Sequence, residues 1–230
     1  MLKRSALAAL VLSIAPLAAG ASTVTIASQS PNLFEGSSAA NVTVSSPVGG
    51  GTFSAGAFAL QGDRDGNGQP EDFFAFCVDI AQTLNLPFAY TVSSSPASAY
   101  LQAKEASIQK LFDSAYSLAA ANLTNSAFSS GFQLALWEVV YESSATYSLG
   151  SGSFTASSSA AAQAETFLAG LASWSGPKIY DLTFYEGGSS QFLVSGDLAP
   201  EVAAVPVPAA AGLLAAALGG LAALKRRRAA

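Results

Sequence analysis

The segment Phe73-Phe-Ala-Phe-Cys-Val-Asp-Ile80 constrains the fold of this chain most strongly. It is an apolar, aromatic run of strand length, which predicts a buried β-strand. It also holds Cys77, the single cysteine among 230 residues. A lone cysteine has no intramolecular disulfide partner, so Cys77 is an inert core thiol, an intermolecular link or half of another kind of bond.

The chain contains no histidine. This excludes Ser-His-Asp and Cys-His nucleophile pairs, because no imidazole is available to accept the proton. It also removes the commonest metal ligand. A hydrolytic enzyme would need a carboxylate pair such as Asp79 with Glu138, and the spacing of these residues does not single them out. We therefore expect that the protein is not an enzyme.

The charges are segregated along the sequence. Lys3 and Arg4 lie at the start and Lys225–Arg228 at the end, and between these ends four basic residues stand against fifteen carboxylates. An acidic body of this kind repels nucleic acid, so we expect no nucleic-acid partner.

The first 21 residues have the pattern of a secretory signal peptide. A basic start is followed by the apolar run Ser5–Ala18 and by the small residues Ala19-Gly-Ala21, which predicts cleavage by signal peptidase before Ser22. The alternative is an uncleaved anchor. Exported proteins usually pair their thiols as disulfides, which makes the single cysteine more unusual.

The C-terminal end, residues 205–230, is also predicted to be a targeting segment. Twenty uncharged residues, Val205–Leu224, are long enough to cross about 30 Å of hydrocarbon. Pro208 fits the first turn of such a transmembrane helix. The basic stop, Lys225, Arg226, Arg227 and Arg228, orients the body outside and the end of the chain in the cytoplasm.

The motif Val205-Pro206-Val207-Pro208-Ala209, a helix and a basic stop together resemble the PEP-CTERM sorting tail in its VPLPA variety, with Val207 in the place of leucine. The resemblance implies a Gram-negative, exopolysaccharide-associated export route in which an exosortase cuts near the motif. The protein would then pass through the inner membrane to the cell surface or a biofilm matrix. The alternative is a plain single-pass anchor.

The body, residues 22–198, changes its period twice. Alternating β-branched residues predict strands at Thr23–Ile26 and Asn41–Val44, and Phe53, Phe58 and Leu60 are expected to continue a single strand. Further strands are expected at Phe88–Val92 and in a final hairpin of Lys178–Tyr185 and Gln191–Val194. Helical spacing predicts three helices, at Ser98–Ala121, at about Ser129–Tyr141 and at Ala160–Trp174. The expected fold is α+β: an antiparallel β-sandwich or barrel-like body with an inserted helical segment, followed by a linker at 199–204 and the transmembrane helix.

The loop Asp63-Arg-Asp65-Gly-Asn67-Gly68 has two interpretations. Oxygen-bearing residues at positions 1, 3 and 5 with glycine at position 6 match the start of an EF-hand calcium loop, and Glu71 falls at position 9. Position 12 is Phe74 where the motif needs glutamate. The other interpretation is a hairpin loop, where Asp, Asn and Gly suit the turn geometry.

Gln133 is the second unusual residue, because it is a polar amide near the start of a largely apolar helix. A buried amide without partners costs a few kcal/mol. A cysteine thiol and a glutamine amide in contact can condense, with loss of ammonia, to an internal thioester. Such a bond is a masked electrophile that is stable while water is excluded and opens when an amine reaches it.

Phe76-Cys77-Val78 and Phe132-Gln133-Leu134-Ala135-Leu136-Trp137 resemble the cysteine and glutamine motifs of the thioester domains of bacterial surface adhesins. The order of the motifs and the helical insert between them agree, over roughly residues 40–195. The resemblance implies a Cys77–Gln133 thioester that captures an amine on a surface or matrix partner, with Asp79, Trp137 and Glu138 as neighbours. Here Phe132 stands where threonine often precedes the glutamine, and the export tail is of the Gram-negative type.

Two functions are therefore carried forward for an exported surface protein. In the first, the body attaches covalently to a partner through the thioester. In the second, it is a non-covalent structural or matrix-binding module, in which Cys77 is a small core residue and Gln133 satisfies a backbone group.

Overall fold

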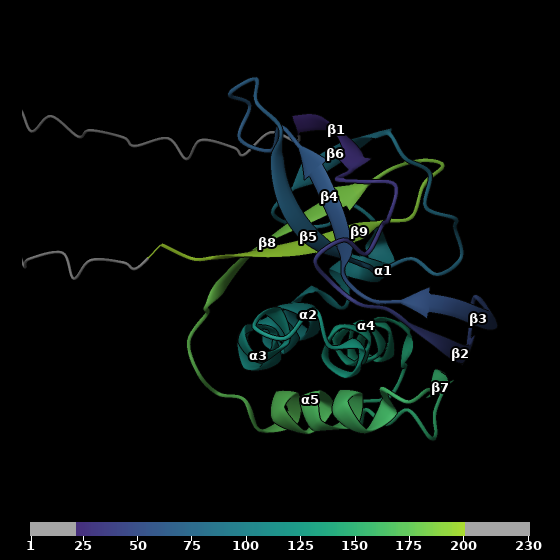
Figure 1. Cartoon of the computed structure of the whole chain (residues 1–230). Helices are drawn as coiled ribbons and strands as arrows, with labels where there is room; N and C mark the ends of the chain where they lie inside the picture. The colour runs from purple at the N-terminus through teal and green to yellow at the C-terminus, as the bar shows by residue number, and fades with distance from the viewer. Residues whose placement is uncertain (1–21, 201–230) are drawn as a thin grey trace, which may run out of the picture. The chain divides into compact units, whose positions relative to one another are not determined.

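The computed structural model describes residues 22–200 (Figure 1). The predicted signal peptide, and the sorting motif, membrane helix and basic stop of the tail, lie outside these residues. Among residues 22–200, no helix has both the length and the apolar character needed to cross a membrane.

The larger of two sheets is a closed antiparallel barrel with the strand order β1-β4-β5-β9-β8-β6. Its strands are β1 (Ser22–Ser28), β4 (Phe58–Gly62), β5 (Glu71–Cys77), β6 (Phe88–Ser93), β8 (Tyr180–Glu186) and β9 (Leu193–Leu198). The strand predicted around Cys77 is β5, and it ends at that residue, where Cys77 is paired with Leu193 of β9. Full closure of the barrel leaves these strands without free edges.

A smaller sheet has the order β3-β2-β7. It consists of β2 (Ala40–Ser46), β3 (Gly49–Ala55) and β7 (Thr155–Ser157). The segment Asn41–Val44, predicted as a strand, lies in β2. β7 lies in a Ser- and Gly-rich stretch for which no strand was predicted.

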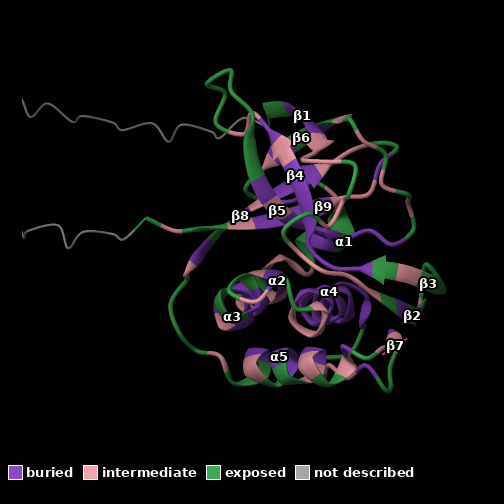
Figure 2. Cartoon of the chain, in the orientation of Figure 1, coloured by how far each residue is buried: buried purple, intermediate pink, exposed green. Residues whose placement is uncertain are grey.

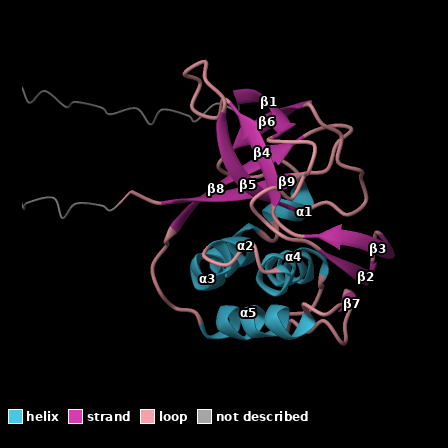
Figure 3. Ribbon diagram, viewed as in Figure 1, coloured by secondary structure: helices cyan, strands magenta, loops and turns pink. Residues whose placement is uncertain are grey.

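The helices lie between β6 and β8 in the sequence. They are α1 (Ala99–Gln102), α2 (Glu105–Leu111), the π-helix η1 (Phe112–Tyr116), α3 (Ser117–Ala120), α4 (Ser126–Tyr141) and α5 (Ala161–Ser173). The helices α2 to α5 form a layer below the barrel, and α1 is drawn nearer to the barrel strands (Figures 1 and 3). The α+β class and the antiparallel barrel-like body with a helical insert are confirmed.

α4 is the central helix. Every residue from Ser129 to Tyr141 is buried (Figure 2), and the helix contacts α2, α3 and α5 as well as β2, β3 and β5. A helix that is apolar on all sides is expected to be buried on all sides. Gly131 allows α5 to approach closely, because a β-carbon at this position would lie 3.1 Å from Cβ of Gln163.

Two helix predictions need correction. The segment Ser98–Ala121 is not one helix: it is interrupted after Gln102, and it contains the π-helix. Asp113, a charged residue of this segment, is buried, and its Oδ1 accepts hydrogen bonds from the backbone N–H groups of Ile179 and Tyr180, just ahead of and at the start of β8. The second helix begins at Ser126, with Asn125 as the N-cap accepting from Ala127 N, rather than near Ser129.

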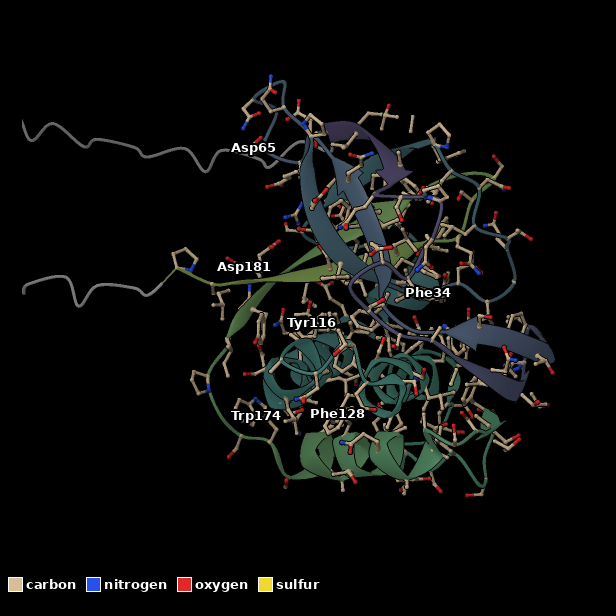
Figure 4. All side chains as sticks on the ribbon, in the orientation of Figure 1. Phe34, Asp65, Tyr116, Phe128, Trp174 and Asp181 are labelled. Carbon is tan, nitrogen blue, oxygen red and sulfur yellow. The ribbon has the colours of Figure 1, made fainter. Side chains whose placement is uncertain are left out.

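An aromatic cluster joins the helices to the barrel. Phe132 of α4 lies 4.8 Å from Phe76 of β5 between ring centroids, 5.1 Å from Phe112 and 5.4 Å from Tyr116. Figure 4 shows Tyr116 on the side of the helices that faces the barrel. Such pairs add about 0.5–1.5 kcal/mol beyond the burial of their area. Phe76 and Phe132 directly precede Cys77 and Gln133, so their packing fixes the position of β5 relative to α4 at the level of the two unusual residues.

Candidate functional site

Cys77 and Gln133 are in direct contact, although 56 residues separate them. The backbone N–H of Cys77 donates to Oε1 of Gln133 at 2.9 Å, and Nε2 of Gln133 donates to the carbonyl oxygen of Cys77 at 2.8 Å. Both residues are buried, with 0% and 1% of their surface exposed. The amide that a thioester would consume therefore faces the residue that carries the thiol.

The thiol of Cys77 is free. Its sulfur donates to the carbonyl oxygen of Asp79 at 3.2 Å, two residues along its own chain. Burial raises the pKa of this thiol to about 12, and interaction with the Asp79 backbone offsets only part of the rise. The thiol is consequently neutral near pH 7, and its sulfur is protected from water and from oxidants.

A cavity of about 230 Å³ ends at the two residues. Its inner wall is formed by buried residues, and its outer part includes the exposed residues Ser54 and Thr83. It is lined by Phe53, Ser54, Phe58, Cys77, Gln82, Thr83, Leu84, Gln133, Trp137 and Gln191. No charged side chain lines it, so an amine entering the cavity leaves its solvation shell behind and meets an apolar wall with a few amide and hydroxyl groups.

Asp79 lies two residues after Cys77 and binds the segment that follows it. Its carboxylate accepts hydrogen bonds from Ala81 N at 3.0 Å and from Nε2 of Gln82 at 2.9 Å. Asp79 is 6% exposed. It therefore lies beside Cys77 as expected, and its contacts hold the loop that carries Gln82 into the cavity.

Glu138 faces a different part of the molecule. Its Oε1 accepts from Ser148 N at 2.7 Å, in the loop that follows α4, and Glu142 and Glu165 are the neighbouring acids. Burial, with these two carboxylates, raises the pKa of Glu138 to about 7. Asp79 and Glu138 thus bind separate backbone groups, and no hydrogen bond joins them among the described residues.

Of the four residues considered for calcium, Asp63, Asp65 and Asn67 lie in the β4–β5 loop, where Figure 4 labels Asp65, and Glu71 is the first residue of β5. Oδ2 of Asp63 accepts from Gly68 N, Oδ1 of Asp65 accepts from Asn67 N, and Glu71 pairs with Arg64 at 2.8 Å. These bonds are those of a hairpin loop, and Gly66 and Gly68 have the positive φ that its turns require. Within residues 22–200, no group of three acidic or cysteine side chains is arranged to hold a metal ion.

Several residues of the cavity have no signal in the sequence. Phe53, Gln82 and Gln191 come from three separate segments, and only the fold brings them to Cys77. Trp137 is different, because it lies one helical turn after Gln133 on α4 and could be placed on the same side of the helix from its spacing.

A comparison with models of known protein families finds no match. A comparison with curated proteins finds none either. Among solved structures, the chain is similar to the N-terminal thioester domain of a surface protein from Clostridium perfringens, in a cysteine-to-alanine mutant, with 13% identity and a TM-score of 0.39 over 62% of this chain and 90% of that one. It is also similar to the N-terminal domain of the pilus tip adhesin Cpa from Streptococcus pyogenes, with 12% identity and a TM-score of 0.40 over 76% of this chain and 98% of that one.

Proposed function

We propose that the body is an adhesin-like surface domain that forms an internal thioester between Cys77 and Gln133 and uses it to attach covalently to an amine on a surface or matrix partner. The observation that carries the proposal is the pair of reciprocal hydrogen bonds, 2.9 and 2.8 Å long, between Gln133 and Cys77 at the inner end of a cavity that reaches exposed residues.

The bond forms when the Cys77 sulfur attacks the side-chain carbonyl carbon of Gln133 and ammonia leaves. Capture reverses the roles: an amine nitrogen attacks the same carbon, the C–S bond breaks, and the Cys77 thiol is regenerated. The result is an amide between Gln133 and the partner. Each molecule reacts once, so the protein is an attachment device and not a turnover enzyme.

The surroundings of the pair suit the storage of such a bond. The apolar inner wall, which includes Phe58 and Trp137, limits the access of water, and water is the competitor that would waste the thioester. The uncharged cavity admits a neutral amine more readily than an ammonium ion, because burying an unpaired charge is costly. A lysine side chain fits this description, since its stem is apolar and its amine lies at the tip.

Intact mass tests the proposal. We expect the wild-type protein to be lighter by one ammonia than the mass calculated from its sequence. Cys77→Ala protein processed in the same way is the reference and should show no such deficit. Methylamine should restore the missing mass as an adduct on Gln133 and expose one titratable thiol. Gln133→Ala serves as the second control. A wild-type mass equal to the sequence, with a freely titrating Cys77, would rule out the thioester.

The alternative is a non-covalent structural or matrix-binding module, and one observation favours it: Gln133 already satisfies both backbone groups of Cys77 in the free-thiol state. In that case the protein has the mass of its sequence, and no complex with the partner persists after boiling in denaturant. Covalent capture predicts the opposite, a complex with the partner that persists under denaturing conditions.

Export completes the proposal. Signal peptidase would remove residues 1–21, and an exosortase would process the tail near Val205–Ala209 after a single-pass stage in the inner membrane. Replacing the basic stop Lys225–Arg228 by uncharged residues should change the release of the body from the membrane fraction. Unchanged fractionation of this variant, with an intact tail seen by mass in the wild type, would contradict sorting.

A further inference from the structure

Trp137 carries a buried hydrogen-bond donor that the fold leaves unused. The residue is 3% exposed, and its indole Nε1 has no hydrogen-bond partner among the described residues. Its ring packs edge-on against Phe53 at 6.1 Å between centroids. A buried donor without a partner costs about 1–3 kcal/mol and calls for an explanation.

The position of the donor relates it to the reactive pair. Trp137 follows Gln133 by one turn of α4, and both residues line the cavity that ends at Cys77. The indole N–H makes no hydrogen bond to the Cys77 sulfur in the free-thiol state, so this donor at the wall of the same cavity remains available. Burial is the dominant influence and raises the pKa of the Cys77 thiol, whereas the neighbouring Trp137 side chain acts to lower it.

We propose that Trp137 is a catalytic residue of the thioester, in which the indole N–H donates to the Cys77 sulfur as negative charge develops there. This inference rests on the proposed function. When an amine attacks the carbonyl carbon of Gln133, the C–S bond breaks and its electron pair passes to the Cys77 sulfur. The N–H of Trp137 stabilises that thiolate, which then takes up the proton lost by the attacking nitrogen.

The same contact assists formation of the bond, because the attacking sulfur must first carry thiolate character. A chain without histidine has no imidazolium to protonate a leaving thiolate. The indole N–H does not give up its proton, so it acts as a fixed donor held in place by α4. A preorganised donor of this kind to an oxyanion contributes about 10²–10³-fold to the rate, and sulfur is the weaker acceptor, so we expect about a tenfold effect here.

The decisive variant replaces Trp137 with the isostere 3-benzothienylalanine, in which a ring sulfur takes the place of the N–H. The chain has two tryptophans, so the analogue is incorporated into full-length Trp174→Phe protein. Trp174 follows the end of α5 and does not line the cavity, which makes Trp174→Phe the matched reference (Figure 4). We expect the analogue to react with methylamine about tenfold more slowly than the reference while showing the same far-ultraviolet circular dichroism. Trp137→Phe should behave in the same way.

A second measurement reports the contact itself. In protein with ¹⁵N-labelled tryptophan, the indole N–H signal of Trp137 should move in Cys77→Ala and again when methylamine opens the thioester, whereas that of Trp174 should stay in place. A folded analogue protein that no longer shows the ammonia deficit also supports the proposal, because the donor assists formation as well.

The outcomes separate the two proposals. An ammonia deficit with an unchanged methylamine rate in the analogue, and an unmoved Trp137 signal in Cys77→Ala, would overturn the role of Trp137 and leave the thioester standing. A full sequence mass in the wild type would end both.

Discussion

The carboxylate of Glu142 occupies the space beside Gly152 so closely that a β-carbon on Gly152 would lie 2.0 Å from Glu142 Oε2. Gly152 also has a φ of +112°, which side chains rarely adopt. The carboxylate can lie there because it accepts hydrogen bonds from Ser144 N at 2.8 Å, Ser153 N at 2.7 Å and Phe154 N at 3.2 Å. The loop after α4 is therefore wound around one carboxylate.

Gly152→Ala should destabilise the fold by about 1–3 kcal/mol, because it adds both backbone strain and a clash with the Glu142 carboxylate. Urea unfolding measures the loss. Gly150→Ala is the matched control in the same loop, since the nearest atom to its β-carbon would be Ser148 Oγ at 4.0 Å. Equal stability of the two variants would contradict this account of the loop.

The pH dependence of stability should carry the signature of Glu142. The hydrogen bond from Ser144 N, with those from Phe154 and Ser153, lowers the pKa of Glu142 from 4.5 to about 2. A carboxyl group with a lowered pKa stabilises the fold fully above its unfolded pKa, and the contribution is lost as the pH falls from 4.5 towards 2. Glu142→Gln should remove this part of the acid sensitivity, as measured by the free energy of unfolding across that range. An unchanged slope below pH 4.5 would exclude Glu142 as its source.

Glu138 should act in the opposite direction. Burial raises its pKa from 4.5 to about 7, so the folded state retains a proton that the unfolded state loses. Its contribution to stability is present below pH 4.5 and is lost as the pH rises through 7. Glu138→Gln keeps an acceptor for Ser148 N and should lose less stability than the wild type between pH 4.5 and 7. A steeper loss in the variant would be inconsistent with a raised pKa.

Phe132→Ala should cost about 3–5 kcal/mol, the range for emptying a buried aromatic site. Phe132 is 0% exposed and packs on Phe76, Phe112 and Tyr116. Phe74→Ala, on the same strand as Phe76 but only partly buried, is the comparison and should cost clearly less. The measurement is again unfolding in urea, with the methylamine reaction as a second readout of the Cys77–Gln133 register.

Much of the architecture follows from local patterns. The strands β1, β2 and β6 could be predicted because their sequences alternate with period 2. Each strand buries alternate residues, as in the buried Val24 and Ile26 of β1. The end of α5 could be predicted because the apolar residues at helical spacing end with Trp174, which is the C-cap of the helix. The strand β7 could not be predicted, because three residues in a Ser- and Gly-rich stretch form a strand only by pairing with β2.

The candidate site divides in the same way. The pairing of Cys77 with Gln133 could be proposed because Cys77 is the single cysteine and Gln133 is a polar amide in a largely apolar helix. The structure brings the two residues into contact. The burial of Asp113 could not be predicted from the helical pattern, because its partners, the N–H groups of Ile179 and Tyr180, lie 66 and 67 residues away. Glu138 was expected as a neighbour of the Cys77–Gln133 pair. It directly follows Trp137 on α4, but consecutive residues of a helix point about 100° apart, and Glu138 faces Ser148 instead.

A thioester would also stabilise the fold, and its opening should be measurable. A bond between residues 56 apart lowers the conformational entropy of the unfolded chain. In the loop-entropy model this stabilises the folded state by about 4 kcal/mol. Methylamine should therefore lower the urea midpoint of wild-type protein and leave that of Cys77→Ala unchanged. Identical midpoints before and after complete methylamine addition would contradict a bond across this loop.

The contact between β5 and α4 determines where tension would enter the molecule. In the proposed capture reaction the partner becomes bonded to Gln133 and the bond to Cys77 breaks, so a tethered partner would pull on α4 alone. That helix is buried along its length from Ser129 to Tyr141 and is surrounded by α2, α3, α5 and three strands. Under this proposal, a pulling force on the partner would be shared among the helices and strands that surround α4.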